Sequence, residues 1–289
     1  MYPYPFSYHR AESVDEALSL LAEYGDGGKL LAGGHSLLPV MKLRLAQPEH
    51  LIDITGIADL SGVRLVGDVI VIGALTTHHA LENDPTLAEG AGLLAEIAHV
   101  VGDQQVRNRG TLGGAIAHAD PAADYPAGVL ALDAVIAARG PNGDRTIPIS
   151  EFFLGFLTTA LEPDEILTAI RIPVLGSNTG YRYEKVANPA SGYAIVGVAA
   201  IVTLDEAGAI ASARIGITGA GDVAYRPESV EQALAGIAPE ADVVASAAES
   251  AVDGVELLAD IHAPAEYRAR VTKNLVRRAV LKAAERARQ

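Results

Sequence analysis

The sequence contains no cysteine, and this absence excludes several kinds of site from the chain. Without thiols the chain can form no disulfide, no thiolate zinc site and no cysteine-ligated iron–sulfur cluster. Long apolar runs are missing too: no stretch of about 18 or more apolar residues occurs, so we expect no membrane-spanning helix. Any iron–sulfur chemistry in which this protein takes part must use cysteines of another polypeptide.

Basic residues are also few, with 22 Lys and Arg against 36 Asp and Glu and a formal net charge of -14. A strongly negative chain is repelled by a phosphate backbone, so we expect no nucleic-acid partner. The first ten residues, MYPYPFSYHR, lack the basic and apolar regions of a secretory signal, which favours a cytoplasmic protein. A length of 289 residues allows one large domain and a smaller one.

What the chain does have is two glycine pairs, Gly33-Gly34 in LLAGGHSLLPVMKLR and Gly113-Gly114 in QQVRNRGTLGGAIAHADPAADYPA. Glycine lets a backbone N–H group approach a bulky anion because no side chain intervenes. Either pair alone is equally consistent with a tight turn. Two such loops in one chain favour a binding site for the diphosphate of a dinucleotide. The residue sequences of both loops indicate that this dinucleotide is FAD.

The hydrophobic pattern around the first pair predicts β-α units over residues 1–60, with a helix over residues 37–45 that Ser36 would cap. A hairpin is expected to turn at Gly67-Asp68. We expect the second pair to form another donor-rich turn, with Arg107 and Arg109 before it able to pair with phosphate. Further predicted elements are a helix at 93–101 and strands at 133–140, 145–149 and 165–173.

A stretch rich in Pro, Gly, Ser and Asn at 173–180 marks the predicted domain boundary. Three strands follow it, and then three helices that start near Pro227, Pro239 and Pro264. The last helix carries eight of the 22 basic residues. That helix is either a solvated cationic face or a docking surface for an acidic partner, with membrane-surface binding a third interpretation.

Two further motifs have competing interpretations. Asp124 accepts hydrogen bonds from ribose or ribityl hydroxyls of a nucleotide, caps the following helix, or does both. His78 and His79 are adjacent, and neighbours on a helix point about 100° apart, so they suit a shared metal ion poorly. We predict no metal site and no catalytic acid, base or nucleophile in this chain.

Four segments together carry a family resemblance: AGGHSLLPVMKLR, RNRGTLGGAIAHADPAADYPA, EILTAIRIP and YRYEKVANPASGYAIVGVAA. In order and spacing the chain resembles the FAD-binding medium subunits of the molybdenum hydroxylases, a family that includes the flavin domains of xanthine and aldehyde dehydrogenases. The carbon monoxide dehydrogenase branch of this family is the most similar in these sequence segments. The resemblance extends over essentially the whole chain.

The resemblance implies an α+β fold in two parts. A two-subdomain FAD-binding domain of the vanillyl-alcohol-oxidase (PCMH) type would occupy residues 1–177, with subdomains of about 1–55 and 56–177. A small domain of three-stranded antiparallel sheet plus three-helix bundle would occupy 178–289. In Ala115 and in the loop ANPASGYA the chain departs from many relatives, and the loop difference leaves the electron acceptor open. The FAD contacts that the resemblance implies are Ala32, Gly33, Gly34, His35, Ser36, Thr111, Leu112, Gly113, Gly114, Ala115, Asp124, Leu167, Lys185 and Tyr193.

The function implied by the resemblance is electron transfer within a complex. A large partner subunit would hold the molybdenum cofactor, a small one two [2Fe–2S] clusters, and the assembly would be a dimer of heterotrimers. Non-covalent FAD on this chain would pass electrons to a quinone, a nicotinamide cofactor or oxygen. The substrate, whether carbon monoxide, an aldehyde, a purine or another N-heterocycle, would bind to another chain.

Two alternatives remain at this point. One is a self-sufficient flavin reductase or oxidase of the same fold class, similar to UDP-N-acetylenolpyruvoylglucosamine reductase, which would need its own substrate domain and proton donor. The other is a non-catalytic assembly subunit with a decayed flavin site, against which the intact glycine pairs argue.

Overall fold

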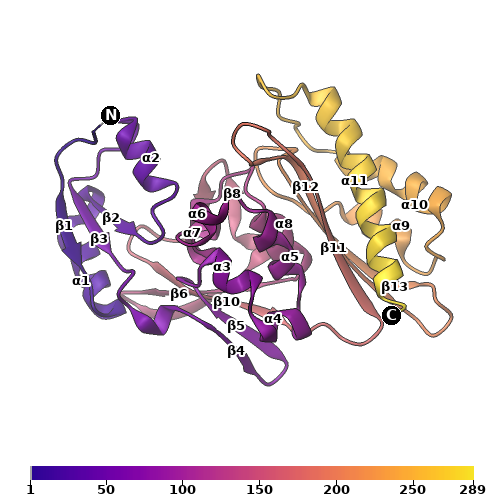
Figure 1. Cartoon of the computed structure of the whole chain (residues 1–289), viewed down its shortest axis with the longest axis horizontal. Helices are drawn as coiled ribbons and strands as arrows, with labels where there is room; N and C mark the ends of the chain where they lie inside the picture. The colour runs from indigo at the N-terminus through magenta and orange to yellow at the C-terminus, as the bar shows by residue number, and fades with distance from the viewer. Residues whose placement is uncertain (1) are drawn as a thin grey trace.

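The computed structural model describes residues 2–289 and consists of three consecutive units, each built on its own sheet. In Figure 1 the units follow one another from the N-terminal unit on the left, through a central unit rich in short helices, to the C-terminal unit on the right. A small two-stranded sheet, β8 (Phe153–Gly155) with β9 (Thr158–Thr159), belongs to the central unit.

The N-terminal unit is a parallel sheet of strand order β1-β3-β2. The helix α1 packs against this sheet and is capped by Ser13, whose side chain accepts a hydrogen bond from the Glu16 N–H group at 3.1 Å. The parallel pairing confirms the predicted β-α units. The elements of this unit are β1 (Ser7–Arg10), α1 (Val14–Tyr24), β2 (Gly28–Leu31), α2 (Leu37–Lys42) and β3 (His50–Asp53).

The central unit is an antiparallel sheet of order β4-β5-β10-β6-β7 with helices packed against it. The hairpin of β4 and β5 turns at Gly67-Asp68 as predicted. Apolar side chains of the sheet and helices form the largest buried cluster of the protein. The elements are β4 (Val63–Val66), β5 (Val69–Gly73), α3 (His78–Glu82), α4 (Pro85–Gly90), α5 (Leu93–Val100), α6 (Gln104–Arg107), α7 (Leu112–His118), α8 (Tyr125–Ala131), β6 (Val135–Gly140), β7 (Gly143–Pro148) and β10 (Ile166–Pro173).

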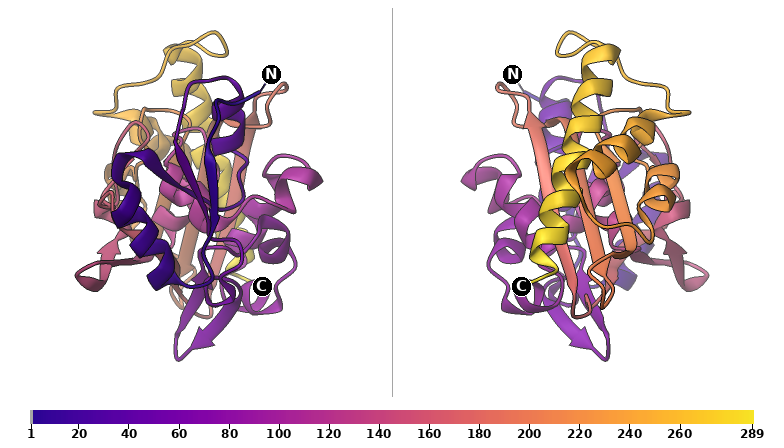
Figure 2. Two further views of the ribbon diagram at one scale, coloured as in Figure 1. Left: turned by 90° about the vertical axis from the view of Figure 1, so that its left-hand side faces the viewer. Right: turned by 90° about the vertical axis from the view of Figure 1, so that its right-hand side faces the viewer.

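The C-terminal unit is a three-stranded antiparallel sheet, β11-β12-β13, with helices over one face. The middle strand is almost entirely apolar because α11 covers one face of the sheet while α8 of the central unit contacts the other (Figure 2). The predicted strands and helices are confirmed. The elements are β11 (Thr179–Ala187), β12 (Ala194–Leu204), β13 (Ile210–Thr218), α9 (Glu228–Leu234), α10 (Ala241–Ala248) and α11 (Ala265–Arg286).

Three local predictions are wrong. Ser36 directly precedes α2 but has helical backbone angles and makes no capping hydrogen bond, and α2 ends at Lys42, earlier than expected. The second glycine pair lies in the first turn of α7, not in a loop. Asp124 does not cap α8, because its side chain is turned to partners on β11.

Two basic residues of α11 fit neither main interpretation of that helix, which were a solvated cationic face and a docking surface for an acidic partner. Arg268 is only 3% exposed and donates to the carbonyl oxygens of Ile195 and Gly219 and to Asp260. Arg286 pairs with Glu96 of α5 at 2.6 Å. Arg268 therefore fixes α11 within the C-terminal unit, and Arg286 ties the same helix to the central unit. Among residues 2–289, no helix combines the length and apolar character that crossing a bilayer requires.

Candidate cofactor site

The first glycine segment, residues 32–36, joins β2 to α2 and has unpaired backbone donors. Gly34 adopts a φ of 73°, which glycine reaches without strain. Within residues 2–289, the N–H groups of residues 33–37 have no acceptor in the chain. The His35 ring instead lies 3.0 Å from the Gly33 carbonyl oxygen and leaves the N–H groups open. This segment therefore presents consecutive donors that suit an anion.

In the second glycine segment, residues 111–115, the N–H groups of residues 112–115 already donate to oxygen atoms of this chain. Thr111 caps α7 by accepting from the Gly114 N–H group at 3.1 Å. The Leu112 and Gly113 N–H groups donate to carbonyl oxygens of Thr76 at 3.0 Å and Ala74 at 2.8 Å. Its glycines serve close packing, because a Cβ on Gly113 would overlap Ala74. The prediction of a second donor-rich turn is thus wrong in this respect.

The two glycine segments nevertheless lie side by side. A Cβ on Gly33 would overlap the carbonyl oxygen of Arg109 and the Cα of Gly110, directly before the second segment. A Cβ on Gly114 would lie 3.9 Å from the Cβ of Ala32. Segments far apart in the sequence therefore form one continuous wall, which only the absence of side chains permits.

Tyr193, in the loop between β11 and β12, reaches this wall from the C-terminal unit. Its side chain is 40% exposed, and partial burial raises the pKa of its hydroxyl. The charge of Asp120 raises that pKa further, whereas a hydrogen bond with Ser36 of the first glycine segment lowers it. Three stretches of chain, from all three units, meet at this point.

Asp124 and Lys185 form a buried ion pair behind the wall. Lys185 Nζ lies 2.9 Å from Asp124 Oδ2 and also donates to the Val100 carbonyl oxygen at 3.2 Å. The Tyr183 hydroxyl donates to Asp124 Oδ1 at 2.6 Å. Burial raises the pKa of Asp124, and the charge of Lys185 partly offsets this rise. This cluster joins α8 of the central unit to β11 of the C-terminal unit.

The sequence did not lead us to predict that Tyr183 belongs to this cluster, although its spacing from Lys185 could have indicated it. Tyr183 and Lys185 are two residues apart on one strand, so their side chains leave the same face of the sheet. Leu167 on β10 is 6% exposed and belongs to the central core together with Leu112. Arg107, a candidate phosphate ligand, instead lies 3.1 Å from Glu82.

His78 supports the second glycine segment from below. Its backbone N–H donates to the Gly110 carbonyl oxygen at 3.0 Å, and its ring lies 5.1 Å from that of Tyr125. Burial lowers the pKa of His78 to about 4, with smaller contributions from the charges of His35 and Arg107. Within residues 2–289, no cluster of His, Asp and Glu has an arrangement suited to a metal ion.

Residues 4–175 match the model of the FAD binding domain in molybdopterin dehydrogenase, and residues 181–283 match the CO dehydrogenase flavoprotein C-terminal domain. The chain belongs to the family of FAD-binding subunits of molybdenum hydroxylases. The resemblance inferred from the four sequence segments is therefore confirmed, and with it the role of this family member as an oxidoreductase subunit that binds FAD.

Relatives of this flavoprotein subunit match it over nearly their full length. The carbon monoxide dehydrogenase medium chain of Hydrogenophaga pseudoflava is 42% identical over 97% of each chain. The 6-hydroxypseudooxynicotine dehydrogenase complex subunit alpha of Paenarthrobacter nicotinovorans is 38% identical, covering 100% of this chain and 97% of the relative. Both relatives are named as parts of enzymes with several subunits, so this subunit too works with partner chains.

Solved structures agree with the fold. Carbon monoxide dehydrogenase from Hydrogenophaga pseudoflava matches with a TM-score of 0.96 at 43% identity, over 99% of both chains. Quinoline 2-oxidoreductase from Pseudomonas putida 86 matches with a TM-score of 0.94 at 31% identity, over 100% of both chains. The α+β architecture, with an FAD-binding domain followed by a small C-terminal domain, is confirmed.

Proposed function

We propose that the two glycine segments hold the FAD of this subunit, with the diphosphate against the first segment. The observation that supports this proposal is that the two segments differ in whether their backbone N–H groups have acceptors in the chain. The N–H groups of residues 33–37 have no acceptor within residues 2–289, whereas those of residues 112–115 are all used. Five consecutive unpaired donors at one glycine bend fit a diphosphate, and a Cβ on Gly33 would disrupt the wall behind them.

The other implied FAD contacts have different roles in this proposal. Tyr193 would lie next to the flavin, because its hydroxyl is close enough to Ser36 of the first glycine segment for that residue to lower its pKa. Asp124 and Lys185 would act mainly by fixing the C-terminal unit against the central one, since each already satisfies the other. Leu167 would support the wall from the core below α7.

We further propose that this subunit forms a dimer of heterotrimers with a large molybdenum-binding subunit and a small iron–sulfur subunit. Bound FAD supplies chemistry in both one- and two-electron steps, which suits a junction between clusters and an external acceptor. The chain itself, with no cysteine, can provide no cluster ligands. Its residues bind and orient the cofactor and exclude water from it.

The complex that we propose is of the carbon monoxide dehydrogenase type. The 42% identical relative and the structure with TM-score 0.96 both carry that name, which supports this choice over the other dehydrogenases among the relatives. Substrate chemistry would take place on the large partner subunit, because we find no acid–base machinery at the wall formed by the two segments.

A matched pair of glycine substitutions tests the FAD site. Gly34 and Gly67 both have positive φ, of 73° and 61°, but Gly67 lies in a distant hairpin with no atom within 4 Å of a built Cβ. Both Gly34→Ala and Gly67→Ala should cost about 1–2 kcal/mol of folding free energy. Only Gly34→Ala should lower the ratio of FAD to protein in the purified complex. Equal FAD retention in both variants would contradict the proposed site.

A second measurement separates this proposal from its alternatives. The subunit purified without partners should bind FAD and show a flavin spectrum, yet turn over no substrate. Turnover by the isolated chain would indicate a self-sufficient flavin enzyme. A colourless chain that ignores added FAD would indicate an assembly subunit.

A further inference from the structure

A group of exposed apolar side chains lies where the start of the chain runs beside α2 (Figure 1). Leu43 and Leu45, directly after α2, are 57% and 76% exposed, and Tyr2 and Tyr4 are 85% and 43% exposed. Arg44 joins the two segments. Its Nε donates to the Tyr2 carbonyl oxygen at 3.4 Å, and its guanidinium lies 4.8 Å from the centre of the Tyr4 ring. We call these five residues the N-terminal patch.

Arg44 stands at a backbone position where glycine is usual. The Leu45 N–H donates to the Val40 carbonyl oxygen at 3.0 Å and the Arg44 N–H to that of Met41 at 2.9 Å. These two hydrogen bonds form a Schellman motif at the end of α2, and Arg44, with a φ of 63°, is its left-handed residue. A side chain is strained there relative to glycine. Because glycine would suit the backbone better, the arginine side chain serves the surface rather than the fold.

The two segments that form the patch are cationic in an otherwise acidic protein. The chain has 36 acidic residues, yet residues 2–11 and 27–48 contain none. The same two segments carry four exposed cations, which are Arg10, Lys29, Lys42 and Arg44. Exposed apolar side chains that gather with Tyr and Arg are typical of a protein–protein interface, and cations beside them favour a partner with acidic groups.

The patch also lies close to the proposed FAD site. The helix α2 follows directly on the first glycine segment, and a Cβ on Gly34 would lie 2.9 Å from Leu38 Cδ1 in its first turn. Since α2 has six residues, its far end is only about 9 Å along the helix from this segment. Electron transfer slows steeply with distance, so a protein that donates electrons to the flavin must dock near this segment.

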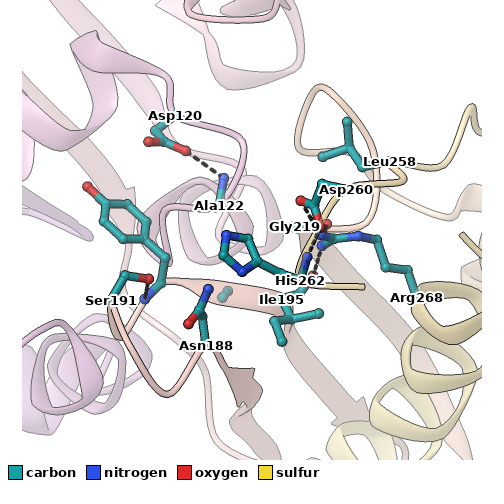
Figure 3. Close-up of a pocket in the computed structure, with 12 residues that line it drawn as sticks. Asp120, Ala122, Asn188, Ser191, Ile195, Gly219, Leu258, Asp260, His262 and Arg268 are labelled. Atoms are coloured by element: carbon teal, nitrogen blue, oxygen red, sulfur yellow. Dashed lines mark hydrogen bonds and ion pairs between the residues drawn. The ribbon is translucent and has the colours of Figure 1, made fainter. Parts of the chain in front are cut away.

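Another opening next to the cofactor wall does not suit an acidic partner. This pocket lies between the central and C-terminal units, and Asp120 and Asp260 place two carboxylates in its lining (Figure 3). The guanidinium of Arg268, which also lines the pocket, is already engaged by Asp260 at 2.7 Å. Charge complementarity therefore favours the N-terminal patch over the pocket.

We propose that the N-terminal patch is the docking surface for the small iron–sulfur subunit. This inference rests on the proposed function, because it needs both that subunit and FAD beside the first glycine segment. A [2Fe–2S] cluster held by four thiolates is anionic, so a chain with two clusters brings negative charge to the interface. The matching surface of the small subunit is apolar at its centre, over the two leucines and the tyrosine rings, and acidic opposite Lys42 and Arg44.

The experiment uses matched substitutions in the complete complex, purified through a C-terminal tag on this chain. Leu45→Glu places a carboxylate in the patch, and Leu65→Glu does the same at another leucine, on β4 of the central unit, that is 57% exposed. Arg44→Gly removes the cation and relieves the backbone strain. For each variant we measure the small subunit, large subunit and FAD per chain, and the melting temperature. Ultracentrifugation of diluted complex at several salt concentrations gives the dissociation constant of the small subunit.

We expect Leu45→Glu to weaken binding of the small subunit about tenfold or more, because its carboxylate is buried opposite acidic groups. Leu65→Glu should leave this binding unchanged. Arg44→Gly should weaken it about fivefold and reduce its dependence on salt, while the melting temperature stays the same or rises. A merely structural role of Arg44 predicts the opposite, which is a lower melting temperature with unchanged binding. FAD content should be equal in all variants.

Three results would overturn the inference. Unchanged binding of the small subunit in Leu45→Glu would place the patch outside the interface. Loss of the large subunit with the small one retained would assign the patch to the other partner. Loss of FAD in Arg44→Gly, with both partners retained, would make the patch part of the cofactor site. A wild-type complex without FAD or without a small subunit would instead contradict the proposed function, so the two failures are distinguishable.

Discussion

The two glycine segments look alike in the sequence but differ in what their backbones do. Residues 33–37 leave their N–H groups without acceptors within residues 2–289, and Gly34 needs a positive φ. The N–H groups of residues 112–115 donate to Ala74, Thr76 and Thr111, and a helix starts there. We therefore propose that the first segment receives the cofactor and that the second supports the first.

This difference teaches that a glycine marks a position where another group comes close to the backbone. Whether that group is a ligand or another part of the chain depends on the fold. At Gly33 the approaching group is the backbone of Arg109, and at Gly113 it is Ala74. A glycine segment that a ligand could approach is recognised only when the backbone N–H groups around the glycine are checked for acceptors within the chain.

The largest effect is expected from Gly33→Val, which breaks the contact between the two segments. A side chain there overlaps the Arg109 carbonyl oxygen, and displacing this backbone should cost about 3 kcal/mol or more. The variant should therefore lose its FAD and melt at lower temperature even without cofactor. Gly176→Val is the control, because no atom lies within 4 Å of its built Cβ. FAD content and thermal unfolding of both variants test this, and FAD retained by Gly33→Val would refute the contact.

The next effect concerns the support beneath the second segment. Burial lowers the pKa of His78 from 6.5 to about 4, so between these pH values the unfolded chain binds more protons than the folded one. Stability therefore falls as the pH falls from 6.5 to about 4, by about 3 kcal/mol in total. Urea unfolding at several pH values measures the slope. His78→Gln should flatten this slope, whereas His79→Gln at the exposed neighbouring position should not; equal slopes in both variants would contradict the assignment.

A smaller effect is expected at the helix caps. Thr111→Ala removes the hydrogen bond to the Gly114 N–H group and should cost about 1 kcal/mol of stability, with or without FAD. Ser13→Ala removes a cap of the same 3.1 Å length from α1, far from the wall, and should cost a similar amount. Chemical unfolding compares the two. A Thr111→Ala variant with unchanged stability in both states would mean that the second segment is not a scaffold.

The smallest effect on the fold is expected at Ser36, which makes no cap. Ser36→Ala should change the stability of the FAD-free protein by no more than about 0.5 kcal/mol, as for an ordinary surface position. FAD affinity should nevertheless fall about fivefold, through loss of one hydrogen bond to the ligand. Fluorescence titration with FAD measures this. A variant that loses stability and keeps its affinity would reverse the comparison of the two segments.

Much of the fold could be predicted from the sequence because local patterns specify it. The turn at Gly67-Asp68 follows from a dipeptide between two apolar strands. The starts of α9 and α11 are marked by Pro227 and Pro264, which stand directly before the first residue of each helix. The helix after the first glycine segment was predicted too long. The apolar pattern continues past Lys42, but Leu43 and Leu45 are exposed and Arg44 has a positive φ.

The site could be predicted only in part, because its groups are brought together by contacts between units. The sequence singled out both glycine segments, but the acceptors of their N–H groups lie at Ala74 and Thr76, on other elements. Asp124 does not cap α8 but pairs with Lys185 of another unit, a contact that the sequence around Asp124 does not indicate. Arg268 looked solvated on a basic helix, yet it is buried against β12 and β13, which no pattern within α11 reveals.

Hydrogen exchange of individual backbone amides, with and without FAD, tests the difference between the two glycine segments most directly. We predict that the amides of residues 33–37 exchange rapidly in the FAD-free protein and become protected when FAD binds. The amides of residues 112–115 should be protected in both states, since the chain itself supplies their acceptors. Amides at 33–37 that do not respond to FAD, or amides at 112–115 that are protected only by it, would contradict the account.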